Sequence, residues 1–171
     1  MLLSAVSALS SPTLPRSSPE FRIEQPSGKT ILLSSLKGKV VVLEFLFVKS
    51  QHCMRVARTL NQLQQELGPS GMQAVGIAFD APNAAATGGE YLEAMAAALN
   101  LSYPVGLAQT ANVDAYLGRS GNEMLSIPQL IVIDRAGTIR AATGGRGNPS
   151  LEDAGALRTL IGGPLKEPAA H

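Results

Sequence analysis

The residue of this chain best suited to covalent chemistry is its single cysteine, Cys53, which ends the segment Ser50-Gln51-His52-Cys53. A thiolate is a nucleophile, but one thiol cannot form an internal disulfide or a thiolate-rich metal site. The two histidines, His52 and His171, also lack the clustered neighbours that zinc or a redox metal needs. We therefore expect thiol chemistry that uses no metal and no cofactor.

Three side chains close to Cys53 in the sequence could control its reactivity. Ser50 stands before a predicted helix, where serine caps the first turn by accepting a backbone N–H. Glu44 interrupts an apolar strand, where burial would raise the pKa of its carboxyl group and let it move protons near neutral pH. His52 would favour a thiolate only if its ring points inward, and a solvated loop position is the alternative.

Opposing effects therefore act on Cys53. A helix N-terminus favours the thiolate through its unpaired N–H groups and its dipole. An ionised Glu44 would disfavour the thiolate through charge repulsion. A third interpretation is that Cys53 is an inert thiol that packs in the core like a small apolar side chain.

The elements that would position these residues alternate between buried strands and amphipathic helices. The apolar run Val40–Phe47 predicts a strand that leads to Ser50, and the apolar spacing after Cys53 predicts a helix that ends at Gly68-Pro69. Further helices are expected over 90–99 and 112–117 and from Pro149 to Gly162-Gly163-Pro164. The other expected strands are a hairpin within Phe21–Leu33, then Met72–Phe79, Tyr103–Leu107, Ile127–Asp134 and Thr138–Thr143.

Length and charge bound the remaining expectations. A chain of 171 residues fits one domain, which we expect over 19–171 after a flexible tail or signal remnant at 1–18. The formal net charge of +1 gives no broad field to hold nucleic acid, so we expect no nucleic-acid partner. No apolar run after the tail is long enough to cross a bilayer.

The order of these elements, with the segments KGKVVVLEF, VGIAFD and SIPQLIVID, resembles the TlpA/ResA and redoxin group of thioredoxin-like proteins, which is related to the AhpC/TSA family. The resemblance covers roughly 21–161. It implies an α/β thioredoxin-like fold, with a central mixed β-sheet flanked by helices and an N-terminal β-hairpin. It also implies a location outside the cytoplasm, although a cytoplasmic one stays open.

The resemblance also implies roles for individual residues. Ser50 and Cys53 match the two positions of the family's Cys-x-x-Cys pair, so the attacking cysteine is replaced by Ser50 and Cys53 holds the resolving position. Glu44 matches a buried acid that moves protons for the second cysteine. Pro128, after Ile127, matches a cis-proline that helps to dock an extended substrate strand beside the motif. His52, which lies within the motif, is the third residue expected to contact that substrate.

Three functions follow as hypotheses. The first is a thiol redox protein in which Cys53 needs an external thiol, from a protein client or a small molecule, to turn over. The second is a one-cysteine peroxiredoxin-like peroxidase, because that family carries Thr or Ser three residues before its reactive cysteine. Leu46 stands where that family has a proline, and Ile127-Pro128 stands where it has an arginine. The third is a client-binding module without catalysis.

Overall fold

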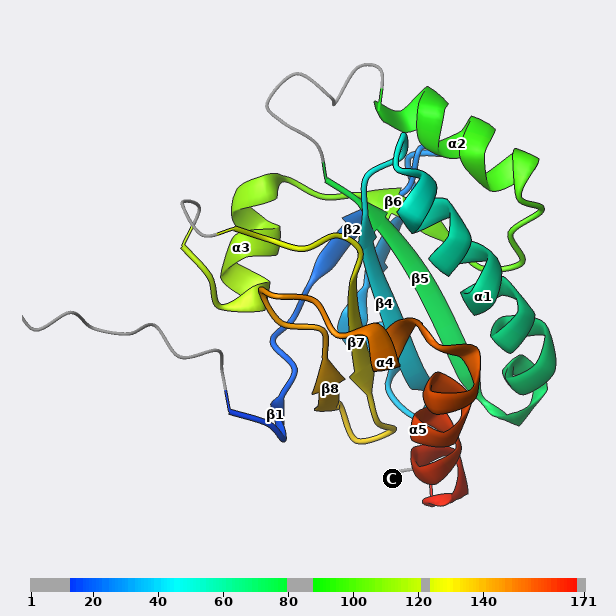
Figure 1. Cartoon of the computed structure of the whole chain (residues 1–171), viewed down its shortest axis with the longest axis vertical. Helices are drawn as coiled ribbons and strands as arrows, with labels where there is room; N and C mark the ends of the chain where they lie inside the picture. Colours follow the sequence, from blue (N-terminus) through cyan, green and yellow to red (C-terminus); the bar gives the residue numbers. More distant parts are fainter. Residues whose placement is uncertain (1–12, 80–87, 121–123, 169–171) are drawn as a thin grey trace, which may run out of the picture.

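The fold is built on one mixed β-sheet, which the computed structural model describes through residues 13–79, 88–120 and 124–168. The strands of these segments are β1 (Arg16–Ser17), β2 (Arg22–Glu24), β3 (Thr30–Leu32), β4 (Val40–Leu46), β5 (Met72–Ala78), β6 (Val105–Leu107), β7 (Gln129–Ile133) and β8 (Thr138–Ala142). They lie side by side in the order β1-β8-β7-β4-β5-β6-β2-β3 (Figure 1). β4 and β5 are therefore central strands.

Helices cover both faces of the sheet. The α-helices of the described segments are α1 (Gln51–Leu67), α2 (Gly88–Ala98), α3 (Thr110–Leu117), α4 (Pro149–Glu152) and α5 (Ala154–Lys166). Two short 3-10 helices, η1 (Leu33–Leu36) and η2 (Gly68–Ser70), connect strands and helices. β4 and β5 are parallel, and α1 makes the crossover between them.

The alternation of side chains along β4 divides the core into two layers. Val40, Val42 and Leu46 belong to one buried cluster, which contains residues of α1, α2, α4 and α5. Val41, Leu43 and Phe45 belong to a second cluster on the other face, which contains residues of α3. All seven residues of β4 are buried because both faces of this strand are covered, which explains its near-continuous hydrophobicity.

Most of the elements expected from the sequence are present. β2 and β3 form the N-terminal hairpin, and its turn contains Gly28 in the left-handed region at φ +83°. β4, α1, β5, β7 and β8 follow where the apolar patterns predict them, and β7 and β8 form the expected antiparallel pair. The Ile127-Pro128 peptide bond is cis, as expected.

Several boundaries differ from the prediction. Arg16 and Ser17, placed in the tail, pair with β8 and form an edge of the sheet. The helix after the cysteine motif starts at Gln51 because Ser50 caps it. The closing helix is interrupted at Asp153, which caps α5 by accepting the Ala156 N–H at 2.8 Å.

The predicted end of the closing helix at Gly162-Gly163-Pro164 is wrong, since α5 continues to Lys166. Leu157, Ile161 and Pro164 are its buried residues, so packing against the core holds the helix together across two glycines and a proline. Residues 1–12 of the expected tail and His171 lie outside the described residues. No helix in the described segments is long and apolar enough to span a membrane.

Candidate functional site

The cysteine motif occupies the first turn of α1, immediately after the carboxyl end of β4. Ser50 is the N-cap, as expected, and its Oγ accepts a hydrogen bond from the Cys53 backbone N–H at 3.3 Å. The capping geometry exists because Ser50 has extended backbone angles while its side chain reaches back to the first turn. Cys53 is therefore fixed as the third residue of the helix.

The Cys53 thiol is completely buried, with 0% of its surface exposed. Its Sγ accepts a hydrogen bond from the Phe47 backbone N–H at 3.5 Å, and it packs in the cluster that contains Val56 and Leu60. Burial raises the pKa of the Cys53 thiol, against hydrogen bonds from the motif that lower it, and the charge of Glu44 raises it further. The balance left open by the sequence thus favours the neutral thiol.

Glu44 is a fully buried acid on the same face of β4 as the cluster around Cys53. Burial raises the pKa of its carboxyl group to about 8, and the nearby Tyr103 hydroxyl opposes that shift. Neither carboxylate oxygen has a hydrogen-bond partner in the described part of the chain. The sequence therefore located a buried acid whose charge acts on the single thiol.

His52 lies at the surface and pairs with a residue that the sequence analysis missed. Its Nε2 is 2.6 Å from Oε2 of Glu152 in α4, and 40% of the His52 side chain is exposed. The two residues are 100 positions apart, and no pattern in the sequence links them. Glu152 thus holds His52 toward α4, so a ring pointed at the Cys53 thiol is not what the structure describes.

The cis-proline stands near the same end of the sheet. Gln129 pairs with Phe45 in the antiparallel ladder between β7 and β4, so Pro128 comes level with the end of β4. Pro128 is buried, and Ile127 is half-buried and packs against both core clusters, including the one that contains Cys53. The fold thus brings together Ser50, Cys53, Glu44 and the Ile127-Pro128 step.

Aromatic residues flank the motif on its exposed side. Phe47 is 40% exposed, and its ring centroid lies 5.2 Å from that of Phe79 at the end of β5. The Lys49 ammonium group lies 4.4 Å from the ring centroid of Tyr91 in α2. An apolar surface with one cation therefore borders the loop from β4 to α1.

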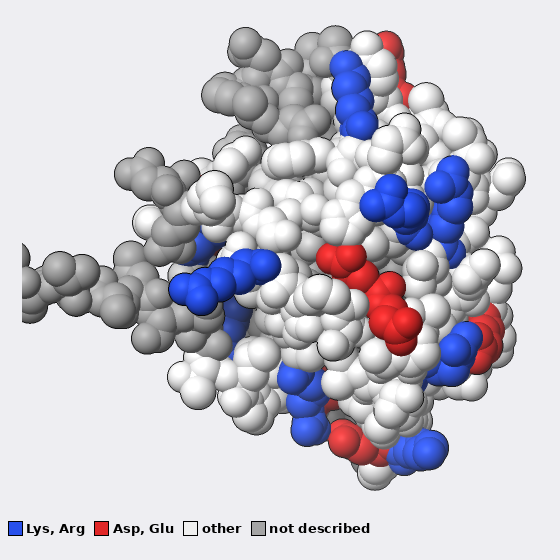
Figure 2. Space-filling view, in the orientation of Figure 1, with Lys and Arg blue, Asp and Glu red and all other residues white. Residues whose placement is uncertain are grey.

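Charges elsewhere on the molecule are mixed. In Figure 2 positive and negative side chains are interspersed over the face shown, which agrees with a formal net charge of +1. No group of three or more possible metal ligands occurs within the residues that the structure describes. The mixed charge of the face shown does not resemble a polyanion-binding surface.

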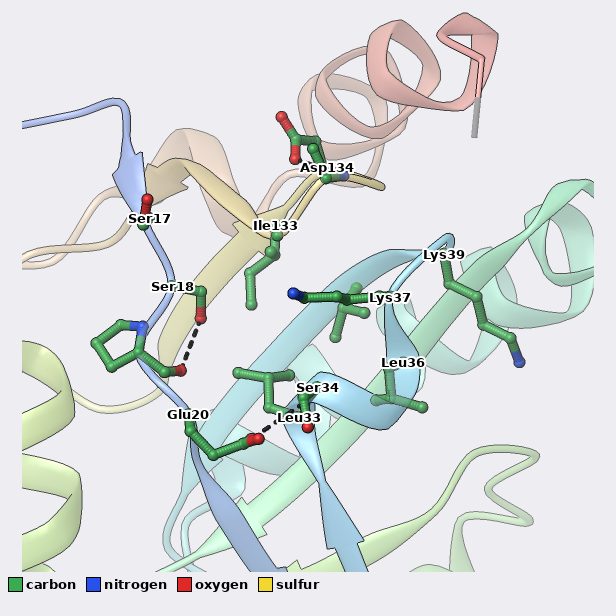
Figure 3. A pocket seen from close by; sticks show the side chains of 14 residues that line it. Ser17, Ser18, Glu20, Leu33, Ser34, Leu36, Lys37, Lys39, Ile133 and Asp134 are labelled. Carbon is green, nitrogen blue, oxygen red and sulfur yellow. Dashed lines mark hydrogen bonds between the residues drawn. The ribbon is translucent and has the colours of Figure 1, made fainter. Parts of the chain in front are cut away.

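A cavity of about 320 Å³ with a mixed polar and apolar lining lies at the opposite end of β4 from the motif. Figure 3 shows the Lys37 side chain extending into it from the end of η1, while Glu20 accepts a hydrogen bond from the Ser34 backbone N–H at 3.0 Å. Residues from four regions line it: Ser17, Ser18, Pro19, Glu20, Leu33, Ser34, Leu36, Lys37, Lys39, Val41, Ile133, Asp134, Ala136 and Gly137. None of the residues expected to act in redox chemistry is among them.

Comparison with solved structures confirms the thioredoxin-like fold. The solution structure of a candidate protein disulfide isomerase from Bacteroides thetaiotaomicron is 28% identical, with a TM-score of 0.71 over 91% of each chain. The crystal structure of a thiol:disulfide interchange protein of the thioredoxin family from Chlorobium tepidum is 22% identical, with a TM-score of 0.70 over 91% of this chain and 99% of that one. A candidate thiol:disulfide interchange protein DsbE from Chlorobium tepidum is 23% identical, with a TM-score of 0.69 over 92% of this chain and 99% of that one.

The sequence itself matches one family. No curated protein is significantly similar to it. The AhpC/TSA family matches residues 16–142, from the first residue of β1 to the last residue of β8, and this segment contains every candidate redox residue. The chain therefore belongs to the AhpC/TSA family.

Proposed function

We propose that this protein is a thiol redox protein in which Cys53 exchanges disulfides with an external thiol. The observation that carries the proposal is the pairing, inside one core, of a single thiol with a buried acid whose charge acts on it. A buried carboxyl group with a pKa of about 8 can give or take a proton near neutral pH. The names of the similar solved structures agree with this class of chemistry.

The proposed cycle has two steps. Ionised Glu44 takes the proton of Cys53, and the thiolate attacks a disulfide of the partner, which forms a mixed disulfide and releases one partner thiolate. An external thiol then attacks the partner sulfur, and the departing Cys53 thiolate recovers its proton from Glu44. An external thiol is needed because the chain has a single cysteine and Ser50 cannot resolve the adduct.

Burial sets the expected rate of this cycle. A thiol that is 0% exposed reacts only when the loop between β4 and α1 opens, so exchange should be slow. Ionised Glu44 accelerates the attack by taking the thiol proton, so the rate should rise as the pH passes about 8. The partner we propose is a protein thiol or disulfide client, or a small thiol, docked beside Ile127 and Pro128.

The test is adduct formation with oxidised glutathione, followed by intact mass spectrometry between about pH 6 and about pH 10. We expect one adduct per chain, absent in C53S, whose formation accelerates through about pH 8 in the wild type. E44Q should form the adduct without that acceleration, whereas E93Q, on the exposed surface of α2, should behave like the wild type. Absence of an adduct on the folded protein at every pH would overturn the proposal.

A client-binding module without turnover is the second candidate function, and the complete burial of Cys53 favours it. In that case the surface around Phe47 and the Ile127-Pro128 step holds an extended client segment while the thiol serves only in packing. Binding of a client peptide that is unaffected by C53S, combined with no glutathione adduct, would support this function. Peroxidase activity is less well supported, because Leu46 and Ile127-Pro128 stand where peroxiredoxins carry a proline and an arginine, so these positions do not supply that family's hydrogen-bonding cradle for a peroxide.

We also propose a location outside the cytoplasm, which rests on the resemblance to the TlpA/ResA group. Fractionation of the producing cells, with the protein detected by antibody, tests it directly. Recovery with the cytoplasmic fraction alone would contradict it.

A further inference from the structure

Glu44 is an unusual residue even among buried acids, because both of its carboxylate oxygens lack a hydrogen-bond partner within the described segments. A buried carboxylate without a donor is costly, since nothing replaces the water it loses. The carboxyl group can therefore stay protonated, or a donor close by can turn toward it when it ionises. The Tyr103 hydroxyl is the donor that interacts with Glu44.

Tyr103 packs beside Gly76, which is the neighbour of Glu44 in the sheet. Gly76 is the partner of Glu44 in the parallel ladder between β4 and β5, so a side chain there would stand next to that of Glu44. A Cβ atom on Gly76 would lie 3.6 Å from Cε2 of Tyr103, in contact with its ring. The tyrosine ring therefore packs beside Gly76, on the face of the sheet that carries Glu44.

Tyr103 is held in this place from both sides. The side-chain Oδ1 of Asn61 in α1 accepts hydrogen bonds from the Ser102 backbone N–H at 2.7 Å and from its hydroxyl at 2.8 Å. The Gly76 N–H donates to the Pro104 carbonyl at 3.1 Å. The Tyr103 hydroxyl itself donates to the Ala57 carbonyl of α1 at 3.3 Å, which is a long hydrogen bond.

We propose that Tyr103 is a positioning residue for Glu44: its hydroxyl bonds to the Ala57 carbonyl while Glu44 is protonated and turns to donate to the Glu44 carboxylate when Glu44 is ionised. The Glu44 carboxylate moves toward the hydroxyl at the same time, because neither of its oxygens is in hydrogen-bonding geometry with a donor in the described segments, while the buried ring and the backbone keep their places. The proton that Glu44 loses goes to solvent in a titration and to the leaving Cys53 thiolate during exchange. The second role rests on the proposed function, whereas the first does not.

The surroundings of Glu44 leave few other groups that could act on it. Cys53 and Tyr103 are the titratable groups that interact with it. Its neighbours on the adjoining strands are Gly76 in β5 and Leu130 in β7, neither of which carries a charge. The residues of α2 and α5 in the same cluster are apolar.

The experiment is a titration of Glu44 by NMR on protein with labelled glutamate side-chain carbons, in the wild type and in Y103F. The wild-type midpoint should lie near about 8, and Y103F should raise it by roughly one to two pH units, because a donor to the charged form is removed. Y116F is the matched control, since Tyr116 is also buried but lies in the other core cluster, where its hydroxyl shares a hydrogen bond with that of Ser18. Y116F should leave the Glu44 midpoint unchanged.

A second measurement follows the Tyr103 ring directly. In wild-type protein with labelled tyrosine rings, the Tyr103 signal should shift with the same midpoint as Glu44, and this shift should vanish in E44Q. An unchanged Glu44 midpoint in folded Y103F, or a Tyr103 signal that does not follow Glu44, would overturn the proposal. If both shifts appear but Cys53 forms no adduct with glutathione, the proposed function fails while the role of Tyr103 stands.

Discussion

At the scale of single residues, Glu44 makes the stability of this protein depend on pH. Its pKa is 4.5 in the unfolded chain and about 8 in the folded one. Between these values the native protein holds a proton that the unfolded chain has lost, so stability falls as the pH rises. The contribution of Glu44 is fully present below about 4.5 and is lost by about 8.

E44Q should therefore flatten the dependence of stability on pH. The shift from 4.5 to about 8 corresponds to roughly 5 kcal/mol at most, so the wild type should lose several kcal/mol across this range relative to the variant. Urea unfolding at several pH values measures it, and E93Q on the surface of α2 serves as the control. Parallel curves for wild type and E44Q would contradict a buried acid with a raised pKa.

The residues of the site differ in how visible they are in the sequence. Glu44 could be identified because it interrupts an apolar strand pattern. Cys53 could be identified because it stands at the start of an amphipathic helix pattern. Tyr103 and Glu152 could not, because their importance comes from contacts with residues far along the chain. The burial of Cys53 also depends on α4 and α5 packing over α1, which no local pattern reveals.

At the scale of elements, the first turn of α1 joins helix stability to the chemistry of the thiol. The Ser50 hydroxyl caps the helix by accepting the Cys53 backbone N–H, and its separate side-chain hydrogen bond to the thiol lowers the pKa of Cys53. The same side chain therefore acts on folding and on reactivity. These two effects can be separated by substitution.

S50A should cost about 1 kcal/mol of stability and should also slow alkylation of Cys53 by iodoacetamide, because the pKa of the thiol rises. S50D should restore the cap, since aspartate accepts the same N–H, but its negative charge should slow alkylation further. S70A, in η2, removes a hydroxyl that caps no helix and is the control. An S50A protein as stable and as reactive as the wild type would show that the cap contributes nothing.

The order and type of the main elements could be predicted because buried strands and amphipathic helices have strong patterns. The limits of α5 could not, because Gly162, Gly163 and Pro164 disfavour a helix locally while Ile161 and Pro164 bury against the core. β1 was also missed, since two residues in a segment rich in serine and proline have no pattern of their own. Its pairing with β8 depends on the edge that the rest of the sheet presents.

At the scale of the whole molecule, the sheet joins parts that are distant in the sequence. Within the sheet, the β2–β3 hairpin joins the central strands through β6, with Glu24 opposite Leu107. At this junction Gly106 allows a close approach, because a Cβ there would lie 2.4 Å from Cγ2 of Ile23 and 2.9 Å from the Glu24 carbonyl oxygen. A side chain at Gly106 would therefore push β2 away from the sheet.

G106A should destabilise the protein by about 1–3 kcal/mol, because the added methyl group overpacks a junction in which a backbone atom must move. G162A is a control of opposite sign, since a Cβ at Gly162 in α5 meets nothing within 4 Å and alanine favours a helix by about 1 kcal/mol. Urea unfolding measures both changes, and amide hydrogen exchange should show faster exchange in β2 for G106A alone. If G106A and G162A shift stability equally, or if β2 exchanges no faster than in the wild type, Gly106 is not what allows the hairpin to join the sheet.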